Sequence, residues 1–133
     1  MIVSVTCSTD RFNLSVVGDD VINECSYGED FSRWLVASLE SQAVEANVVC
    51  MEGFGWANTA KEAGNSYLMY VGGVADGGPD HPNRGQWRVM LERNRTLMDK
   101  ILGKNMISPE DPLVKRVVQI LTSAGFSQVV IEL

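Results

Sequence analysis

Residues 44–71 read VEANVVCMEGFGWANTAKEAGNSYLMYV, and this stretch decides the fold. It holds three runs typical of strands, at 44–51, 56–62 and 66–71, separated by two glycine-containing turns. Strands joined by such short turns pair antiparallel, because a parallel connection needs about a dozen residues or more. The stretch therefore predicts an antiparallel sheet, with the mostly apolar strand 44–51 at a central position.

Four more strands are predicted outside this stretch. Residues 2–7 and 12–17 alternate apolar and polar side chains, and the turn residues between them indicate a hairpin. Two further strands, at 86–92 and 126–133, each place alternate apolar residues on one face. These residues are Trp87, Val89 and Leu91 in the first strand and Val129, Ile131 and Leu133 in the second.

The clearest helix spans residues 26–42. Ser26 and Glu29 have the spacing of a capping box, and Glu29 and Asp30 place negative charge at the positive end of the helix dipole. One apolar stripe runs along the helix, made of Phe31, Trp34, Leu35 and Leu39. Aromatic residues at this spacing indicate a core face rather than a binding motif.

Two helices are predicted before the last strand. We expect Asn94 to cap the first and Gly103 to end it. We expect Ser108, followed by Pro109, to begin the second, with Gly125 at its end. The residues expected to face inward are Leu97, Met98, Ile101 and Leu102 in the first helix and Leu113, Val117, Ile120, Leu121 and Ala124 in the second.

The predicted order of elements is β-β-α-β-β-β-β-α-α-β. This order indicates the α+β class, a mainly antiparallel sheet with about three helices packed on one face. The chain has 133 residues, of which 45% are hydrophobic, and we expect residues 1–133 to form a single domain.

The charge of the chain is uneven. Eleven Lys and Arg against seventeen Asp and Glu give a net charge of -6, which argues against a nucleic-acid partner. Residues 1–62 carry ten of the acids and three of the bases, so the excess belongs to the N-terminal half. An acidic face of this kind steers a basic partner, although it is also typical of a solvated surface that favours solubility.

Cysteine usage and hydropathy bear on location. The three cysteines, Cys7, Cys25 and Cys50, are odd in number and have no CxxC spacing, so we expect neither a disulfide framework nor a zinc site. No apolar run approaches the roughly 18 residues of a membrane span, and we expect no membrane partner. A reducing cytoplasm is the expected location.

Catalytic motifs are absent from the sequence. The one histidine, His81, lies in residues 72–85, where five Gly and two Pro predict a long loop. Asp76, Asp80 and His81 make this loop the alternative candidate for an enzymatic, ligand or metal site, although their spacing matches no known metal loop. The leading expectation is that the protein is not an enzyme and has no cofactor or bound metal.

Two features remain as candidates for binding a partner. The first is the acidic stretch 19–30, represented by Asp19, Asp20 and Glu24. The second is the turn 52–56, where an acid lies beside glycine-flanked aromatic residues suited to anchoring in a partner's pocket. Its candidate residues are Glu52, Phe54 and Trp56. A Trp that folds back over the sheet edge is the simpler interpretation of this turn.

Residues 26–92 also carry a resemblance. Glu29-Asp30-Phe31 with Trp34-Leu35 and Leu39 is followed by Glu52-x-x-Gly55-Trp56 and then by Trp87-x-Val89. This pattern resembles a class of small acidic bacterial α+β proteins, several of which look like immunity proteins of polymorphic or contact-dependent toxin systems. The resemblance implies a cytoplasmic inhibitor that binds and neutralises a cognate toxin, without catalysis or a cofactor.

Three functional hypotheses follow. The leading one is an inhibitor or immunity protein whose toxin is basic or processes nucleic acid. The second is a small enzyme or ligand-binding domain with its site at 72–85. The third is a homo-oligomer, such as a homodimer, in which strand 44–51 or the C-terminal strand pairs across an edge.

Overall fold

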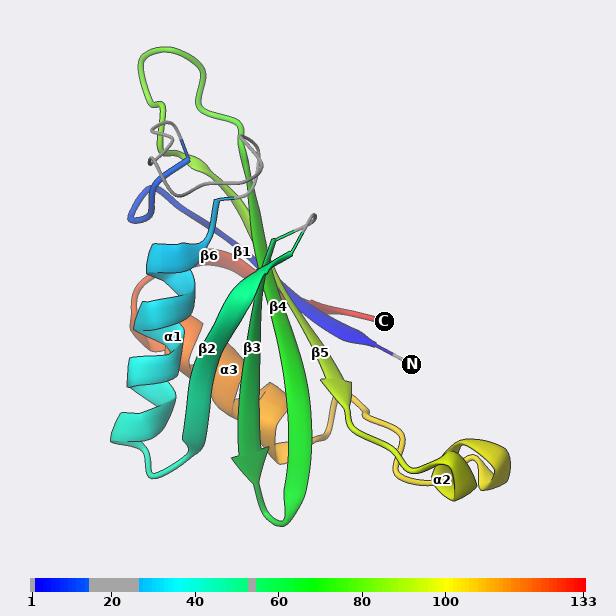
Figure 1. The fold of residues 1–133 in the computed structure, drawn as a ribbon. Coiled ribbons are helices and arrows are strands. Elements are labelled where there is room, and N and C mark those ends of the chain that lie inside the picture. The colour runs from blue at the N-terminus through cyan, green and yellow to red at the C-terminus, as the bar shows by residue number, and fades with distance from the viewer. Residues whose placement is uncertain (1, 15–26, 53–54) are drawn as a thin grey trace.

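The computed structural model describes residues 2–14, 27–52 and 55–133, with only the backbone at 51 and 52. In chain order the elements are β1 (Val3–Thr9), α1 (Glu29–Ser41), β2 (Glu45–Glu52), β3 (Gly55–Glu62), β4 (Asn65–Ala75), β5 (Gly85–Arg93), α2 (Leu97–Leu102), α3 (Pro112–Ser123) and β6 (Ser127–Glu132). The strands form one six-stranded antiparallel sheet in the order β2-β3-β4-β5-β1-β6. The α+β class and the mainly antiparallel sheet are confirmed (Figure 1).

The hairpin of β3 and β4 has a two-residue turn. Glu62 pairs with Asn65, so only Ala63 and Gly64 connect the strands, and both have positive φ, 52° and 80°. This is the backbone of a type I′ turn, whose twist matches that of the strands it joins.

The predicted central position of strand 44–51 is wrong. β2 is an edge strand, and a register shift between Val48 and Cys50 interrupts its pairing with β3. Val49, at this irregularity, is 58% exposed. The apolar run does not identify a central strand. An edge strand that covers the core with one face can also carry apolar residues on its other face.

The predicted hairpin of 2–7 with 12–17 is not formed by the described residues. β1 lies inside the sheet, with β5 along one edge and β6 along the other, so neither edge is open to the next segment. Residues 12–14 are not a strand, and 15–17 lie outside the described residues. Phe12 instead packs with its ring 4.6 Å from that of Phe31 on α1, which explains its apolar character.

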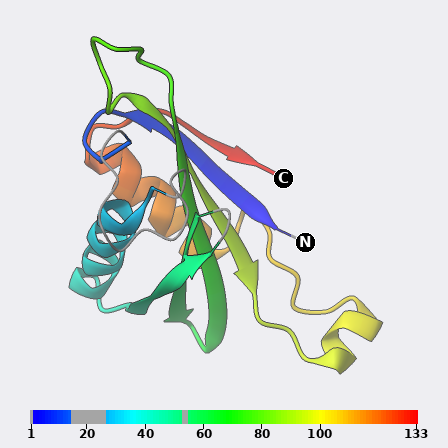
Figure 2. The same cartoon turned by 45° about the horizontal axis from the view of Figure 1, so that its top comes forward.

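The core lies between the sheet and two helices, α1 and α3 (Figure 2). The predicted inward faces of these helices and of β5 are confirmed, and the fully buried members include Phe31, Leu35, Leu39, Trp87, Val89, Leu91, Leu113, Val117 and Leu121. The third helix differs. α2 has no buried residue, so two helices rather than three pack on the sheet.

The helices begin later than the sequence predicts. α1 is capped by Gly28, without a side-chain cap, and Ser26 lies outside the described residues. α3 begins at Pro112, and Asp111 rather than Ser108 is its N-cap. In each case the cap lies nearer the first buried turn than the predicted Ser, and packing of that turn sets the start of the helix.

The two ends of the glycine-rich segment 72–85 belong to strands, with 72–75 in β4 and Gly85 in β5. β4 continues to Ala75 because Gly73 lies beneath Trp87, where an added Cβ would come within 2.7 Å of the indole. The remaining loop, 76–84, is held by backbone hydrogen bonds, including Asp76 N to Arg84 O at 2.9 Å. In the described part of the chain, no helix has the length and hydrophobicity of a membrane span.

Candidate protein-interaction surface

Five of the six predicted partner-binding residues can be placed only in part or not at all. Asp19, Asp20, Glu24 and Phe54 lie outside the described residues. Glu52 ends β2 opposite Gly55, and its side chain is not described.

Trp56 is the one predicted partner-binding residue whose side chain is described. It lies on β3 opposite Val71 and is half-buried. Its ring lies close to Gly28, the N-cap of α1, where an added Cβ would be 3.3 Å from Trp56 Cδ1. The indole therefore folds back over the sheet toward α1, the simpler of the two arrangements expected for this turn.

The loop 76–84 does not bring its polar residues into one cluster. Asp76, Asp80 and His81 are all exposed. Among the residues that the structure describes, no three His, Cys, Asp or Glu side chains are grouped to hold a metal ion. The loop closes instead on its own backbone around Gly77, where an added Cβ would lie 2.3 Å from His81 O.

The structure reveals a different surface between β5 and α3. Residues 94–107, which we call the α2 arm, extend away from the sheet and the two packed helices (Figures 1 and 2). The arm carries five exposed large apolar side chains: Leu97 (76%), Met98 (60%), Ile101 (68%), Leu102 (55%) and Met106 (41%). They are concentrated in one short segment, and the described residues leave them uncovered.

The α2 arm is folded by its own hydrogen bonds. Thr96 and Asp99 form a capping box, with Asp99 N to Thr96 Oγ1 at 3.0 Å and Thr96 N to Asp99 Oδ2 at 3.1 Å. Hydrogen bonds from Asn105 and from the Thr96 backbone lower the pKa of the Asp99 carboxyl. Arg95 donates to Lys104 O at 2.9 Å and so ties the start of the arm to its end.

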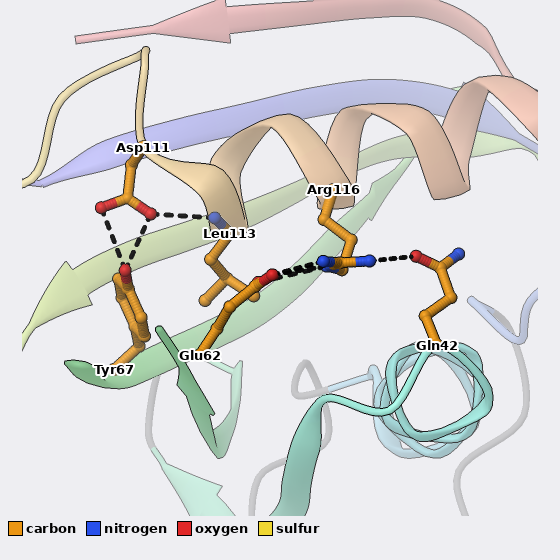
Figure 3. Close-up of polar contacts among 6 residues, drawn as sticks. All are labelled: Gln42, Glu62, Tyr67, Asp111, Leu113 and Arg116. Atoms are coloured by element: carbon orange, nitrogen blue, oxygen red, sulfur yellow. Dashed lines mark hydrogen bonds and ion pairs between the residues drawn. The ribbon is translucent and has the colours of Figure 1, made fainter. Parts of the chain in front are cut away.

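A buried ion pair closes the base of the arm. Arg93, the last residue of β5, and Asp111, the N-cap of α3, are 2.7 Å apart, and the Asp111 side chain is 1% exposed. Asp111 also accepts from Tyr67 Oη at 2.9 Å and from Leu113 N at 2.9 Å (Figure 3). Ile107, which is 2% exposed, anchors the returning chain in the core. The arm is thus held at both ends by buried contacts.

The same contacts shift two pKa values. Burial, together with the hydrogen bond to the Asp111 carboxylate, raises the pKa of Tyr67 to about 12. Burial alone would lower the pKa of Arg93, but its hydrogen bond and charge interaction with Asp111 outweigh this and raise it. Tyr67 therefore stays neutral and Arg93 charged at ordinary pH.

A second polar network fixes α3 on the body of the protein. Arg116 Nε donates to Glu62 Oε1 at 2.9 Å, and Arg116 also donates to Gln42 Oε1 at 2.8 Å (Figure 3). These contacts join α3 to the end of β3 and to the C-cap of α1. Polar contacts at Asp111 and at Arg116 therefore fix the first half of α3 to the sheet and to α1.

Sequence reasoning places the apolar residues of the α2 arm in the core, and this prediction is wrong. Residues 97, 98, 101 and 102 do form one apolar face of a helix, as the spacing indicates. The helix has only six residues, and the segments on both sides of it leave the sheet, so the face does not reach the core. The sequence did contain a signal that this segment is exposed, because the apolar residues lie among three bases, Arg95, Lys100 and Lys104.

Comparison of the chain with protein-family models, curated proteins and solved structures finds no significant match. The function must therefore be inferred from the structure and the sequence of this chain alone. Several exposed apolar side chains on one short segment, flanked by charged residues and anchored at its base, are typical of a site that binds another protein.

Proposed function

We propose that this protein is a protein-binding inhibitor of the immunity type, which neutralises a cognate toxin in the cytoplasm by direct binding and without catalysis. The observation that carries the proposal is the α2 arm, with its exposed apolar residues Leu97, Met98, Ile101 and Leu102. The resemblance of residues 26–92 to immunity proteins supports the same class.

The arm has the properties of a binding element prepared in advance. Its capping box and the Arg95 contact to Lys104 O already hold the helix, so little ordering remains when a partner binds. Covering Leu97 and Ile101 removes apolar area from water, which is the main favourable term in protein association. Met98 adds a side chain that adapts to irregular surfaces.

The predicted acidic surface has a separate role in this proposal. Asp19, Asp20 and Glu24 speed the approach of a basic toxin over long distance, whereas the arm supplies short-range apolar contact. Charge reversal at these three residues should therefore lower the association rate and flatten its salt dependence, with little change in the dissociation rate. Stopped-flow rates that are the same at every salt concentration would contradict this role.

The experiment needs a candidate toxin, and the first to test is any toxin-like protein encoded beside the gene for this chain. Purified chain and candidate are titrated by calorimetry, and co-expression is scored for rescue of cell growth. Leu97→Lys with Ile101→Lys should weaken binding roughly a hundredfold, since two central apolar contacts are lost. The matched control is Val74→Lys, because Val74 is equally exposed (72%) but lies on β4 outside the arm.

The outcomes are distinct. Binding and rescue that survive the arm substitutions and fail with Val74→Lys would place the contact elsewhere and contradict the proposal. Alanine at Asp76, Asp80 and His81 tests the alternative hypothesis for loop 76–84. We expect this triple variant to bind and rescue like the unchanged protein.

A further inference from the structure

The outer edge of β6 has the properties of a strand that pairs with another strand. β6 is the last strand of the sheet, beside β1, and no other strand of the described residues lies on its outer side (Figure 2). Its exposed apolar residues include Val130 (51%) and Ile131 (37%), followed by Leu133 (83%). An exposed apolar edge of this kind presents unpaired backbone groups on which another strand can pair.

Charge does not protect this edge. Glu132 is the only charged residue of 127–133, although the whole chain has a net charge of -6. Glu132 forms an ion pair with Arg88 at 3.0 Å, so its charge is compensated within the same sheet. The segment also contains no Lys and no Pro, the residues that commonly block edge pairing.

The opposite edge of the sheet differs. β2 carries a register shift beside Val49, in the middle of the strand, which bends an edge and disfavours pairing. β6 has its own register shift only at the start, near Gln128, whose φ is 54°. Val130, Ile131 and Glu132 pair with β1 without a further shift, and two of these three residues are apolar, so β6 is the edge suited to pairing.

The register of β6 on β1 defines which side chains share a face. Ile131 pairs with Val5, a core residue, so Ile131 points toward the helix-covered face. By alternation Val129 and Leu133 point the same way, and Val129 already packs against the core. An antiparallel copy centred on Ile131 places Val129 of one copy opposite Leu133 of the other, so apolar residues meet apolar residues along the whole row.

We propose that two copies of this chain associate through β6, antiparallel and with Ile131 opposite itself, so that their sheets join into one. A second copy is the occupant that this edge fits best, because a two-fold axis through Ile131 matches the row Val129–Ile131–Leu133 to itself. Such an isologous contact is the commonest form of protein dimer. The interface is separate from the α2 arm and does not depend on the proposed function.

The first test is sedimentation of the full chain over a wide concentration range. The unchanged protein should show a reversible dimer. Leu133→Asp should raise the dimer dissociation constant tenfold or more, because it places a carboxylate opposite Val129 of the second copy. Leu133 is 83% exposed, so the fold of the single chain is unaffected. Val49→Asp on β2 is the matched control and should leave the dimer intact.

The second test measures the register. In a background with Cys25→Ser and Cys50→Ser, Ile131→Cys should form a covalent dimer on mild oxidation. Residues directly opposite have Cα atoms about 4.5–5.5 Å apart, within disulfide range. Val130→Cys is the control and should stay monomeric under denaturing electrophoresis, because the two copies of residue 130 are diagonal neighbours about 7–8 Å apart.

Three results would overturn the proposal. One is a chain that stays monomeric at every concentration. Another is a dimer that is broken by Val49→Asp, or by the Leu97→Lys and Ile101→Lys substitutions of the arm, but not by Leu133→Asp. The third is a monomeric chain whose complex with a different protein is weakened by Leu133→Asp, which would assign the edge to a strand of that partner.

Discussion

Removing the charge of Asp111 should destabilise the protein strongly, because this one carboxylate joins three parts of the fold. It pairs with Arg93 at 2.7 Å, accepts from Tyr67 and caps α3 through Leu113 N. Asp111→Asn keeps an oxygen for the cap but loses the charge, and an amide group then faces the Arg93 guanidinium. Asp111→Ala removes all of these contacts.

The expected magnitude follows from burial. Breaking a buried ion pair by removing one partner costs about 3–5 kcal/mol, because a charge remains without compensation. Arg93 is 18% exposed and can reach water in part, so the lower end applies and Asp111→Asn should cost about 3 kcal/mol. Asp111→Ala also loses the N-cap, worth about 1 kcal/mol, and should cost about 4 kcal/mol. Tyr67→Phe, which removes a single hydrogen bond to a charged group, should cost about 1.5 kcal/mol.

The assay is equilibrium unfolding in urea, read as the midpoint at constant slope. Hydrogen exchange provides a local readout, since the Asn94 amide donates to Ser66 O at the base of the arm. We expect this amide to lose protection in Asp111→Asn and to keep most of it in Tyr67→Phe. A loss of less than about 1 kcal/mol in Asp111→Asn would refute the view that the ion pair closes the arm.

Three more outcomes follow from the described residues. The folded protein holds Tyr67 neutral, with a pKa of about 12 against the ordinary 10.0. The free energy of unfolding that Tyr67 contributes below pH 10 should therefore fall as the pH rises toward 12. Urea titrations at stepped pH should show this fall in the unchanged protein and not in the Tyr67→Phe variant. Burial raises the pKa of the Cys7 thiol to about 11, whereas Cys50 is exposed. Mass spectrometry after brief thiol labelling at pH 8 should therefore find Cys50 modified and Cys7 unmodified until the protein unfolds. Early labelling of Cys7 would contradict its burial. Gly73→Ala should destabilise the fold by about 1–3 kcal/mol, because the new methyl group would overlap the buried Trp87 ring. A variant that is as stable as the original in thermal unfolding would show that β4 and β5 move apart easily at this position.

Short-range patterns predicted the individual elements well. The stripe of α1, the alternation of β5 and the glycine-containing turn between β3 and β4 are all confirmed, because each depends on neighbours close in the chain. The helix starts were placed too early, because several polar residues can serve as caps and packing of the first turn selects one. The order of the elements agrees with the prediction apart from the strand at 12–17.

Long-range placement was not available from the sequence. A run such as 44–51 has the same composition at a centre or an edge, and the pairing of β1 with β5 and β6 brings together residues at least 76 positions apart. The burial of α2 was predicted wrongly for a related reason. An apolar helix face indicates that something covers it, but the pattern does not say whether the cover belongs to the same chain.

The sequence by itself determined the α+β class, the antiparallel sheet, and the uneven charge that makes residues 1–62 acidic, because composition, periodicity and turn residues are local properties. Only the tertiary structure decided that β2 and β6 are the edges, that Asp111 joins β4, β5 and α3, and that the α2 arm stands outside the core. The physical reason is that burial belongs to pairs of surfaces rather than to single segments. The same apolar residues form a core where another part of the chain covers them, and a binding surface where none does.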